Sequence, residues 1–338
     1  MRALIVGSGL QASRRAPAIA SVAGSSVVAV VGPDAVRARA VAEPLGAAWG
    51  ADVRGWLSRD DVDAVVVCTP PDVHREIALA ALAAGKHVLC EKPLAMTSAE
   101  AREMVRAAAA RGRVLKCGFN HRHHPAVAAM KAHVEAGGVG RPLFGRAIYG
   151  FGGRPSMAGE WRADPRRTAG GHLMEQGIHA IDLFRWLTGE PHAVTCRTAT
   201  AVFPIEPLED NAFCLLERED GFVASVHASL LQWRNRFEIE VYGADGYAAV
   251  TGLGGSYGTE RLVVASRDPS APFAETITEY RAADPSWRLE WEELCCAARE
   301  RRVPLGSGED GVAAMELVEA AYRSARTGRR VAVGGRDA

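Results

Sequence analysis

The chain has 338 residues, 48% of them hydrophobic and 24% charged, which is typical of a globular protein with roughly two domains. Its 40 basic residues balance its 40 acidic residues, so no net electrostatic field attracts nucleic acid or an anionic membrane surface. We therefore expect a small neutral or modestly charged ligand, with neither nucleic acid nor a membrane as partner.

The composition also predicts a cytoplasmic protein. The apolar run at residues 3–6 is too short for a signal peptide, and no segment approaches the roughly 20 apolar residues that span a membrane. The seven cysteines include no C-x-x-C spacing, which indicates reduced thiols rather than a disulfide framework or a zinc site.

The N-terminal part of the chain alternates between short β-rich runs and Ala-rich helical stretches. We expect strands at 3–6, 27–31, 64–68, 87–89 and 114–117, and helices at 10–22, 34–44, 73–84 and 98–111. This alternation predicts a doubly wound parallel sheet with helices on both faces, and we place a dinucleotide-binding Rossmann domain at 1–122.

The pattern changes after residue 122. We expect strands at 143–151, 193–203, 211–217, 221–231, 236–242 and 258–265, with helices at 124–136, 171–187, 288–300 and 307–326. Successive strands with few helices predict a C-terminal α/β domain, 123–338, with a large, mostly antiparallel, open-faced sheet for substrate binding and oligomerisation. An uncovered sheet face predicts a homodimer or homotetramer. As an alternative to a place in the second domain, the helix at 307–326 could pack back on the Rossmann domain.

A glycine-rich turn follows the first strand. Gly7 would make the tight turn, Gly9 would let the backbone approach a pyrophosphate, and Ala12 stands where a third glycine is usual. Leu10 and Gln11 open the following helix, whose N-terminus favours negative charge. An ordinary strand-to-helix turn has the same pattern, so the motif needs support from elsewhere.

The end of the second strand bears on cofactor preference. NAD enzymes commonly place an acid there for the ribose diol, whereas NADP enzymes omit it and place a basic residue nearby. Gly32 stands at that position, and Arg37 follows five residues later. These residues favour NADP over NAD, although Asp34 could still bind the ribose of NAD.

Further motifs resemble those of the glucose-fructose oxidoreductase and inositol dehydrogenase (Gfo/Idh/MocA) family. The resemblance runs from residue 1 to about residue 334 and is carried by Thr69–His74, Ala84–Pro93, Gly118–Arg122 with Pro125, Trp161–Arg162, Gly170–His179 with Asp182, and Tyr322–Gly328. The Glu91-Lys92-Pro93 motif after a strand is its most specific element.

The family resemblance implies a Rossmann domain, an open-sheet domain, and oxidation or reduction of a secondary alcohol or ketone on a sugar or cyclitol with NAD or NADP. By resemblance, Lys92 and His179 occupy the catalytic positions, and Glu175 stands where the family usually has Asp. On the same basis we assign cofactor contacts to Thr69, Pro70, His74, Glu91 and Lys92.

The residue types suit this chemistry. When hydride leaves the carbinol carbon, a proton leaves the hydroxyl, so the site needs a base and a cation to stabilise the alkoxide. Lys92 supplies the charge, and His179, with an ordinary pKa of about 6.5, is the natural acid/base. The alternatives are a surface lysine, a core histidine and, for Glu175, a salt-bridge partner on the helix face.

Helical spacing places His172, Glu175, His179 and Asp182 on one stripe of the helix expected at 171–187. Two histidines and a carboxylate could bind a metal, but we expect none, because Lys92 already supplies the positive charge. His172 and Glu175 are candidate substrate contacts, and Asp182 either orients His179 or accepts hydrogen bonds in the helix packing.

The remaining polar candidates are assigned to the substrate. Asn120 and Arg122 follow the last Rossmann strand, where ligands of parallel sheets bind, and a loop-anchoring role is the alternative. Trp161 and Arg162 precede the catalytic helix and suit a polyhydroxylated sugar. We interpret three neighbouring histidines as unrelated residues pointing in different directions, with His123 nearest the cleft: His121, His123 and His124.

Three functional classes stay open from the sequence. The leading one is a sugar or cyclitol dehydrogenase or ketoreductase. The second is a redox-neutral epimerase or glycosidase with tightly bound nicotinamide, and the third is a ligand-sensing regulator. Lys92 and His179 argue against the regulator, because sensing needs no proton-transfer pair.

Overall fold

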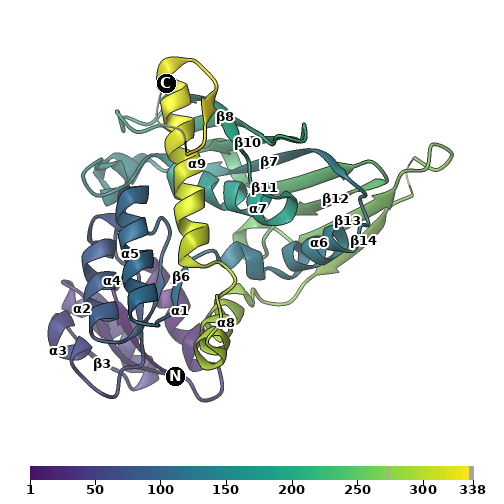
Figure 1. The fold of residues 1–338 in the computed structure, drawn as a ribbon. Coiled ribbons are helices and arrows are strands. Elements are labelled where there is room, and N and C mark those ends of the chain that lie inside the picture. Colours follow the sequence, from purple (N-terminus) through teal and green to yellow (C-terminus); the bar gives the residue numbers. More distant parts are fainter. Residues whose placement is uncertain (273, 335–338) are drawn as a thin grey trace. The chain divides into compact units, whose positions relative to one another are not determined.

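A computed structural model describes residues 1–272 and 274–334 (Figure 1). The chain forms two compact units, the first made of Met1–Asn120 with Pro285–Val312 and the second of His121–Asp284 with the chain from Ala313 onward. Segment 285–312 therefore returns to the first unit, whereas the sequence placed all of 123–338 in the second domain. Residues 335–338 of that predicted domain lie outside the described part of the chain.

The first unit contains a six-stranded parallel sheet in the order β3-β2-β1-β4-β5-β6. The strands are β1 (Arg2–Val6), β2 (Ser26–Val31), β3 (Ala48–Gly50), β4 (Ala64–Val67), β5 (His87–Cys90) and β6 (Leu115–Cys117). The helices are α1 (Leu10–Ala20), α2 (Ala35–Ala42), α3 (Val53–Leu57), α4 (His74–Ala83) and α5 (Ser98–Ala110). The predicted Rossmann fold is confirmed, and only the short elements β3 and α3 escaped prediction.

Local sequence explains several of these elements. All four residues of β4 are buried apolar side chains, as expected for a central strand covered on both faces. Helix α5 begins with a capping box. The Thr97 side chain accepts a hydrogen bond from Glu100 N, and the Glu100 side chain accepts one from the backbone N–H of Thr97. Strand β3 has only three residues, two of them exposed, so it contains no buried apolar run that would predict a strand.

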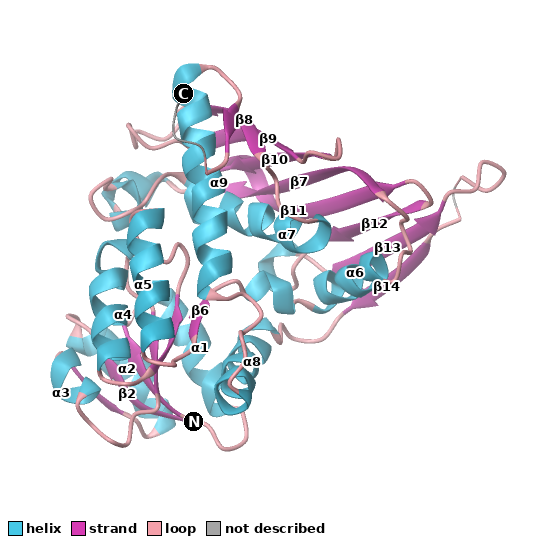
Figure 2. Ribbon diagram, in the orientation of Figure 1, coloured by secondary structure: helices cyan, strands magenta, loops and turns pink. Residues whose placement is uncertain are grey.

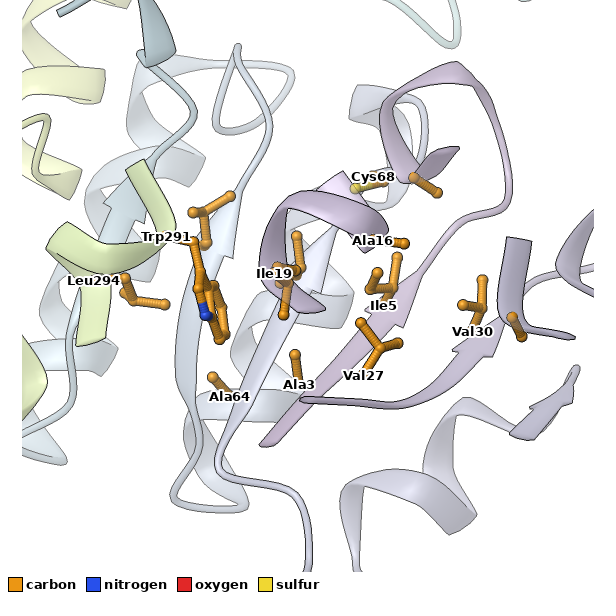
Figure 3. Packing of buried hydrophobic residues seen from close by; sticks show 14 of the residues in the cluster. Ala3, Ile5, Ala16, Ile19, Val27, Val30, Ala64, Cys68, Trp291 and Leu294 are labelled. Carbon is orange, nitrogen blue, oxygen red and sulfur yellow. The ribbon is translucent and has the colours of Figure 1, made fainter. Parts of the chain in front are cut away.

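Helix α8 (Ser286–Glu300) belongs to the core of the first unit. Trp291 and Leu294 pack with Ala3, Ile5 and Ile19 (Figure 3). The indole Nε1 of Trp291 also donates to Ser25 Oγ at 2.9 Å. From the sequence, the helix expected at 307–326 was the candidate for packing on the Rossmann domain. In the structure, α8 belongs to the first unit, and helix α9 (Gly308–Thr327) is divided between the two units after Val312.

The second unit contains a nine-stranded sheet in the order β14-β13-β12-β11-β7-β10-β9-β8-β15 (Figure 2). The strands are β7 (Pro142–Gly152), β8 (Ala193–Ala199), β9 (Asn211–Glu217), β10 (Val223–Ser229), β11 (Leu231–Gly243), β12 (Gly246–Thr251), β13 (Glu260–Ser266), β14 (Thr276–Tyr280) and β15 (Val331–Ala332). All pairs are antiparallel except β10 with β7, which confirms the expected sheet type. Strands β12, β14 and β15 escaped prediction.

Two helices pack against this sheet. Helix α6 (Pro125–Glu135) contacts β12, β13 and β14, and helix α7 (Ile178–Thr188) contacts β7 and β10. Inward residues of β9 alternate strictly with exposed ones such as Phe213 and Leu215, so one face is packed and the other is open. Within the described residues, no helix is long and apolar enough to cross a membrane.

The helix expected at 171–187 is not continuous. Residues Leu173–Gly177 (η6) wind as a π-helix before α7 begins at Ile178. Since a π turn bonds i to i+5, the spacing of 3.6 residues per turn fails across it. The spacing that placed His172 and Glu175 on one stripe with His179 and Asp182 therefore does not hold across this turn. Such π turns are frequent at functional sites.

Candidate active site

The glycine turn has the geometry of a dinucleotide site. Gly7 has φ +106°, and a Cβ there would lie 2.7 Å from the carbonyl carbon of Cys68, so any larger residue would push β1 and β4 apart. Gly9 is the N-cap of α1, and among the described residues no side chain caps this helix. The first turn of α1 also contains no acidic residue, which leaves its positive end available to an anion.

Two buried polar atoms beside this turn fit a ligand. Gln11 Oε1 and Thr69 Oγ1 have no hydrogen-bond partner among the described residues. Buried polar atoms are normally satisfied, so such exceptions point to a group that binds there. Leu10 is exposed and Pro70 is half buried at the same end of the sheet. These residues fit the cofactor contacts assigned from the sequence.

His74 links the two loops of this site. Its Nδ1 lies 2.9 Å from Pro93 O and its Nε2 lies 2.8 Å from Thr69 O. The ring is buried, and burial lowers the pKa of His74. Both ring nitrogens are thus engaged by the backbone, and His74 ties the turn after β4 to the loop that carries Lys92.

Glu91 is part of a buried ion-pair network that the sequence did not reveal. Arg15 Nε contacts Glu91 Oε1 at 2.6 Å, and Arg15 Nη1 contacts Glu290 Oε2 at 2.7 Å. Burial opposes the charge on Arg15, but the two carboxylates outweigh it and raise the pKa. The network joins α1 to the residue before the half-buried Lys92, so it holds the loop of the candidate catalytic lysine against the cofactor-binding helix.

The residues that bear on cofactor preference lie at the start of α2. Asp34 caps this helix by accepting from Arg37 N at 3.0 Å, and its carboxylate lies 3.1 Å from Arg37 Nε. A Cβ at Gly32 would lie 3.2 Å from Ser8 Oγ, which places Gly32 beside the glycine turn. The carboxylate of Asp34 is therefore already bound by the backbone and side chain of Arg37.

Asn120 anchors helix α8. Its Nδ2 donates to Ser286 Oγ at 3.0 Å, and both residues are buried in the first unit. This contact supports the loop-anchoring alternative for Asn120 that the sequence left open.

The second unit contributes His179, which lies in the first turn of α7 and is 3% exposed. Its ring stacks on that of His121, with centroids 3.8 Å apart and an interplanar angle of 17°. His121 Nε2 lies 2.9 Å from Tyr149 Oη. The sequence interpretation assigned His121 no role of its own, and it did not predict this contact with His179. A run of three histidines in four residues does not indicate which of them faces the helix.

Arg122 and Asp182 form a buried, bidentate ion pair. Arg122 Nε and Nη2 donate to the Asp182 carboxylate at 2.8 and 2.6 Å. The Arg122 guanidinium also lies 5.4 Å from the ring centroid of Trp186. These contacts favour a packing role for Asp182, and they hold the segment after the last Rossmann strand against α7.

Glu175 and Arg162 form an ion pair next to Trp161. The Arg162 guanidinium donates to the Glu175 carboxylate and lies 4.5 Å from the Trp161 ring centroid. All three residues are half buried, so this cluster is open to solvent. His172 is buried with its ring 5.5 Å from that of Phe151.

Glu209 is another residue that sequence reasoning missed. It accepts from Gly171 N at 3.2 Å and Leu173 N at 2.8 Å, and Tyr322 Oη donates to it at 2.9 Å. Burial raises the pKa of Glu209 despite these donors. A carboxylate here satisfies the first N–H groups of the segment that leads to His179. No local pattern connects residue 209 with that segment.

No group of three or more His, Cys, Asp or Glu side chains in the described part of the chain is arranged to hold a metal ion. Two of the three neighbouring histidines have separate partners, since His124 Nδ1 lies 2.9 Å from Glu260 Oε2 while His121 stacks on His179.

Comparison with known protein families matches residues 1–119 to the oxidoreductase family, NAD-binding Rossmann fold, and residues 127–249 to the GFO/IDH/MocA C-terminal domain. Inositol 2-dehydrogenase 2 of Saccharopolyspora erythraea is 30% identical, and the match covers 96% of this chain and 93% of that protein. D-apiose dehydrogenase of Paraburkholderia graminis is 29% identical, with 97% and 88% covered.

Among solved structures, the aldose-aldose oxidoreductase from Caulobacter crescentus complexed with glycerol is similar, with a TM-score of 0.86 and 27% identity. The match covers 98% of this chain and 99% of that one. A parallel sheet with this glycine turn is typical of a dinucleotide-binding domain, and the family match makes it that of an oxidoreductase. The chain belongs to the GFO/IDH/MocA oxidoreductase family. The predicted family, fold class and enzyme class are thereby confirmed.

Proposed function

We propose that this enzyme transfers a hydride between a nicotinamide cofactor and a secondary alcohol or ketone of a sugar, cyclitol or related polyol. The observation that carries the proposal is the uncapped N-terminus of α1, a helix that the Arg15–Glu91 ion pair joins to the residue before Lys92. Relatives named inositol 2-dehydrogenase, D-apiose dehydrogenase and aldose-aldose oxidoreductase support the substrate class.

The nicotinamide, when bound, supplies the hydride acceptor or donor. We assign its pyrophosphate to the backbone of Gly7 and Gly9 and to the first turn of α1. In alcohol oxidation, the Lys92 ammonium donates a hydrogen bond to the developing alkoxide, and His179 accepts the hydroxyl proton. Glu175, in the cluster with Arg162, binds a further substrate hydroxyl.

A substrate screen tests this proposal. We expect a panel of polyols and keto-sugars to produce a change in nicotinamide absorbance with at least one compound. Mass spectrometry of any nucleotide that copurifies identifies the cofactor independently. A tightly bound nucleotide with no absorbance change for any compound would contradict the dehydrogenase assignment and favour a redox-neutral enzyme.

We expect NADP(H) to bind more tightly than NAD(H). Gly32, directly after β2, has no carboxylate that would repel a 2′-phosphate, and Asp34 is already engaged as the cap of α2. Arg37 is 73% exposed and can turn toward a phosphate. Arg37→Ala should therefore weaken NADPH binding at least about 10-fold, as expected for a charge-assisted hydrogen bond, and leave NADH binding unchanged. Fluorescence titration measures both affinities.

Arg39→Ala is the matched control, because Arg39 lies on the same helix and pairs with Glu43 at 2.8 Å. It should leave both affinities unchanged. Gly32→Asp should reverse the preference toward NADH. Equal or tighter binding of NADH by the wild-type enzyme, unaffected by Arg37→Ala, would show that the preference is wrong.

The open sheet face supports a homodimer or homotetramer. It contains a groove of about 440 Å³ and exposes the apolar side chains of Phe213 and Leu215.

Leu215→Arg should convert the oligomer to a smaller species, because a charge in the centre of an apolar interface costs several kcal/mol. Light scattering at micromolar concentration measures the mass. Val303→Arg, an exposed apolar position in the first unit, is the control. A monomeric wild-type protein would refute the assembly.

A cytoplasmic location is also proposed. All seven cysteines are free thiols, five of them buried, which suits a reducing compartment. Fractionation of cells that express the tagged chain would place it there or elsewhere.

A further inference from the structure

We infer that His74 is a proton-dependent positioning residue of the cofactor site, which holds the turn at Thr69 only while both of its ring nitrogens carry a proton. The ring lies between two backbone carbonyl groups, those of Thr69 and Pro93, and all three residues belong to the first unit. The effect on the cofactor rests on the proposed function, whereas the protonation of His74 does not.

The two contacts of His74 require two donors. Nδ1 lies 2.9 Å from Pro93 O, and Nε2 lies 2.8 Å from Thr69 O. A carbonyl oxygen only accepts hydrogen bonds, and a neutral imidazole has a single N–H group, so a neutral ring turns a lone pair toward one of the two carbonyls. Only the imidazolium donates to both. The arrangement in the structure is therefore that of the protonated ring.

Burial decides which contact the neutral ring keeps. Pro93 is buried, whereas Thr69 is half buried. Water can replace the ring at Thr69 O more readily than at Pro93 O, where an acceptor without a donor costs more free energy. The neutral ring therefore keeps its proton on Nδ1. Loss of the other proton releases the Thr69 turn, while the loop that carries Lys92 stays bound through Pro93 O.

The surroundings place this proton in the range of mildly acidic pH. Burial lowers the pKa of His74 below its ordinary value of about 6.5, although its two carbonyl contacts and the carboxylates of Glu91 and Asp72 oppose the shift. The second proton is therefore present at low pH and is lost as the pH rises through this lowered pKa. The other charged groups on the elements around the ring are Arg15, which pairs with Glu91, Lys92, Glu76, and Arg75, which pairs with Glu103.

Thr69 couples the proton to the cofactor. Thr69 Oγ1 is buried and has no hydrogen-bond partner among the described residues, which fits the cofactor contact assigned to it. A nucleotide that binds the held form of the turn favours protonated His74, and by reciprocity the bound nucleotide raises the pKa of His74. Cofactor affinity should therefore rise as the pH falls through this pKa, and binding should take up a proton there.

Nitrogen-15 NMR of the cofactor-free protein, labelled at histidine, tests the protonation without any activity. We expect His74 to carry protons on both ring nitrogens below its pKa and on Nδ1 alone above it. His87 is the internal control, because its Nδ1 accepts from Val114 N at 3.0 Å and its neutral ring must carry the proton on Nε2. His74→Gln identifies the His74 signals. A neutral His74 with its proton on Nε2 would overturn the inference, and so would a ring that stays neutral down to the pH at which the protein unfolds.

Titrations with NAD⁺ test the effect on the cofactor. NAD⁺ is the probe because it lacks the 2′-phosphate, a group that itself titrates near about pH 6. The wild-type protein should bind NAD⁺ at least about 3-fold more tightly at about pH 5.5 than at about pH 8, and calorimetry in two buffers should record proton uptake at about pH 6.

Two variants complete this test. His74→Gln should lose the pH dependence of NAD⁺ affinity, and His87→Gln should keep it. An unchanged pH dependence in folded His74→Gln would show that His74 does not control the turn. If NAD⁺ failed to bind at any pH while the NMR result held, the proposed function would fail and the protonation of His74 would stand.

Discussion

Lys92→Ala and His179→Ala are expected to lose about 10²- to 10⁴-fold in turnover while keeping the fold and most of the cofactor affinity, since this is the usual cost of removing a group that acts on the proton or on the alkoxide. The Lys92 loop is supported by the ion pair of Glu91 with Arg15, so truncating the lysine leaves that support intact. Steady-state kinetics with parallel cofactor titrations measures both quantities.

The pH profile distinguishes the two roles. Only a neutral imidazole accepts a proton, so the acidic limb of turnover for alcohol oxidation should vanish or move in His179→Ala and persist in Lys92→Ala. Glu175→Gln is the comparison variant and should change substrate affinity more than turnover. Wild-type turnover and an unchanged acidic limb in His179→Ala would mean that His179 is not the base.

Glu290→Ala is expected to lower the free energy of unfolding of the first unit by about 3–5 kcal/mol, because it leaves the buried charge of Arg15 with one carboxylate fewer. Glu290 Oε2 lies 2.7 Å from Arg15, and Glu290 Oε1 lies 3.9 Å from Lys116 Nζ. All three side chains are almost fully buried, so water cannot replace the lost carboxylate. Urea unfolding followed by far-ultraviolet circular dichroism measures the change.

Glu292→Ala is the matched control on the same helix. Its carboxylate pairs with Arg288 at 2.6 Å, but both side chains are more than a third exposed, at 42% and 35%. An exposed pair of this kind contributes no more than about 1 kcal/mol. If both variants lost the same stability, the buried network would not be what secures α8 to the first unit.

The network also links stability to the site. Arg15 lies on the helix whose N-terminus we assign to the pyrophosphate, and Glu91 immediately precedes Lys92. Glu290→Gln keeps the shape of the side chain but removes its charge. We therefore expect this variant to stay folded and to bind the cofactor more weakly than the wild-type protein.

The sequence by itself determined what depends on local patterns. The β4 run and the capping box of α5 are specified within a few residues, and so is the turn at Gly7, where φ is +106°. The alternation of strand and helix periods therefore identified the Rossmann fold. Characteristic motifs around Lys92 and His179 identified the family for the same reason.

Only the tertiary structure decided which distant residues meet. Arg15 and Glu290 are 275 positions apart, and an amphipathic pattern shows that a helix buries one face without showing what covers it. The same limit hid the return of α8 to the first unit and the stack of His121 on His179. The π turn at Leu173–Gly177 also escaped prediction, because apolar spacing assumes 3.6 residues per turn throughout. Long-range packing, not local preference, placed the side chains around the candidate base.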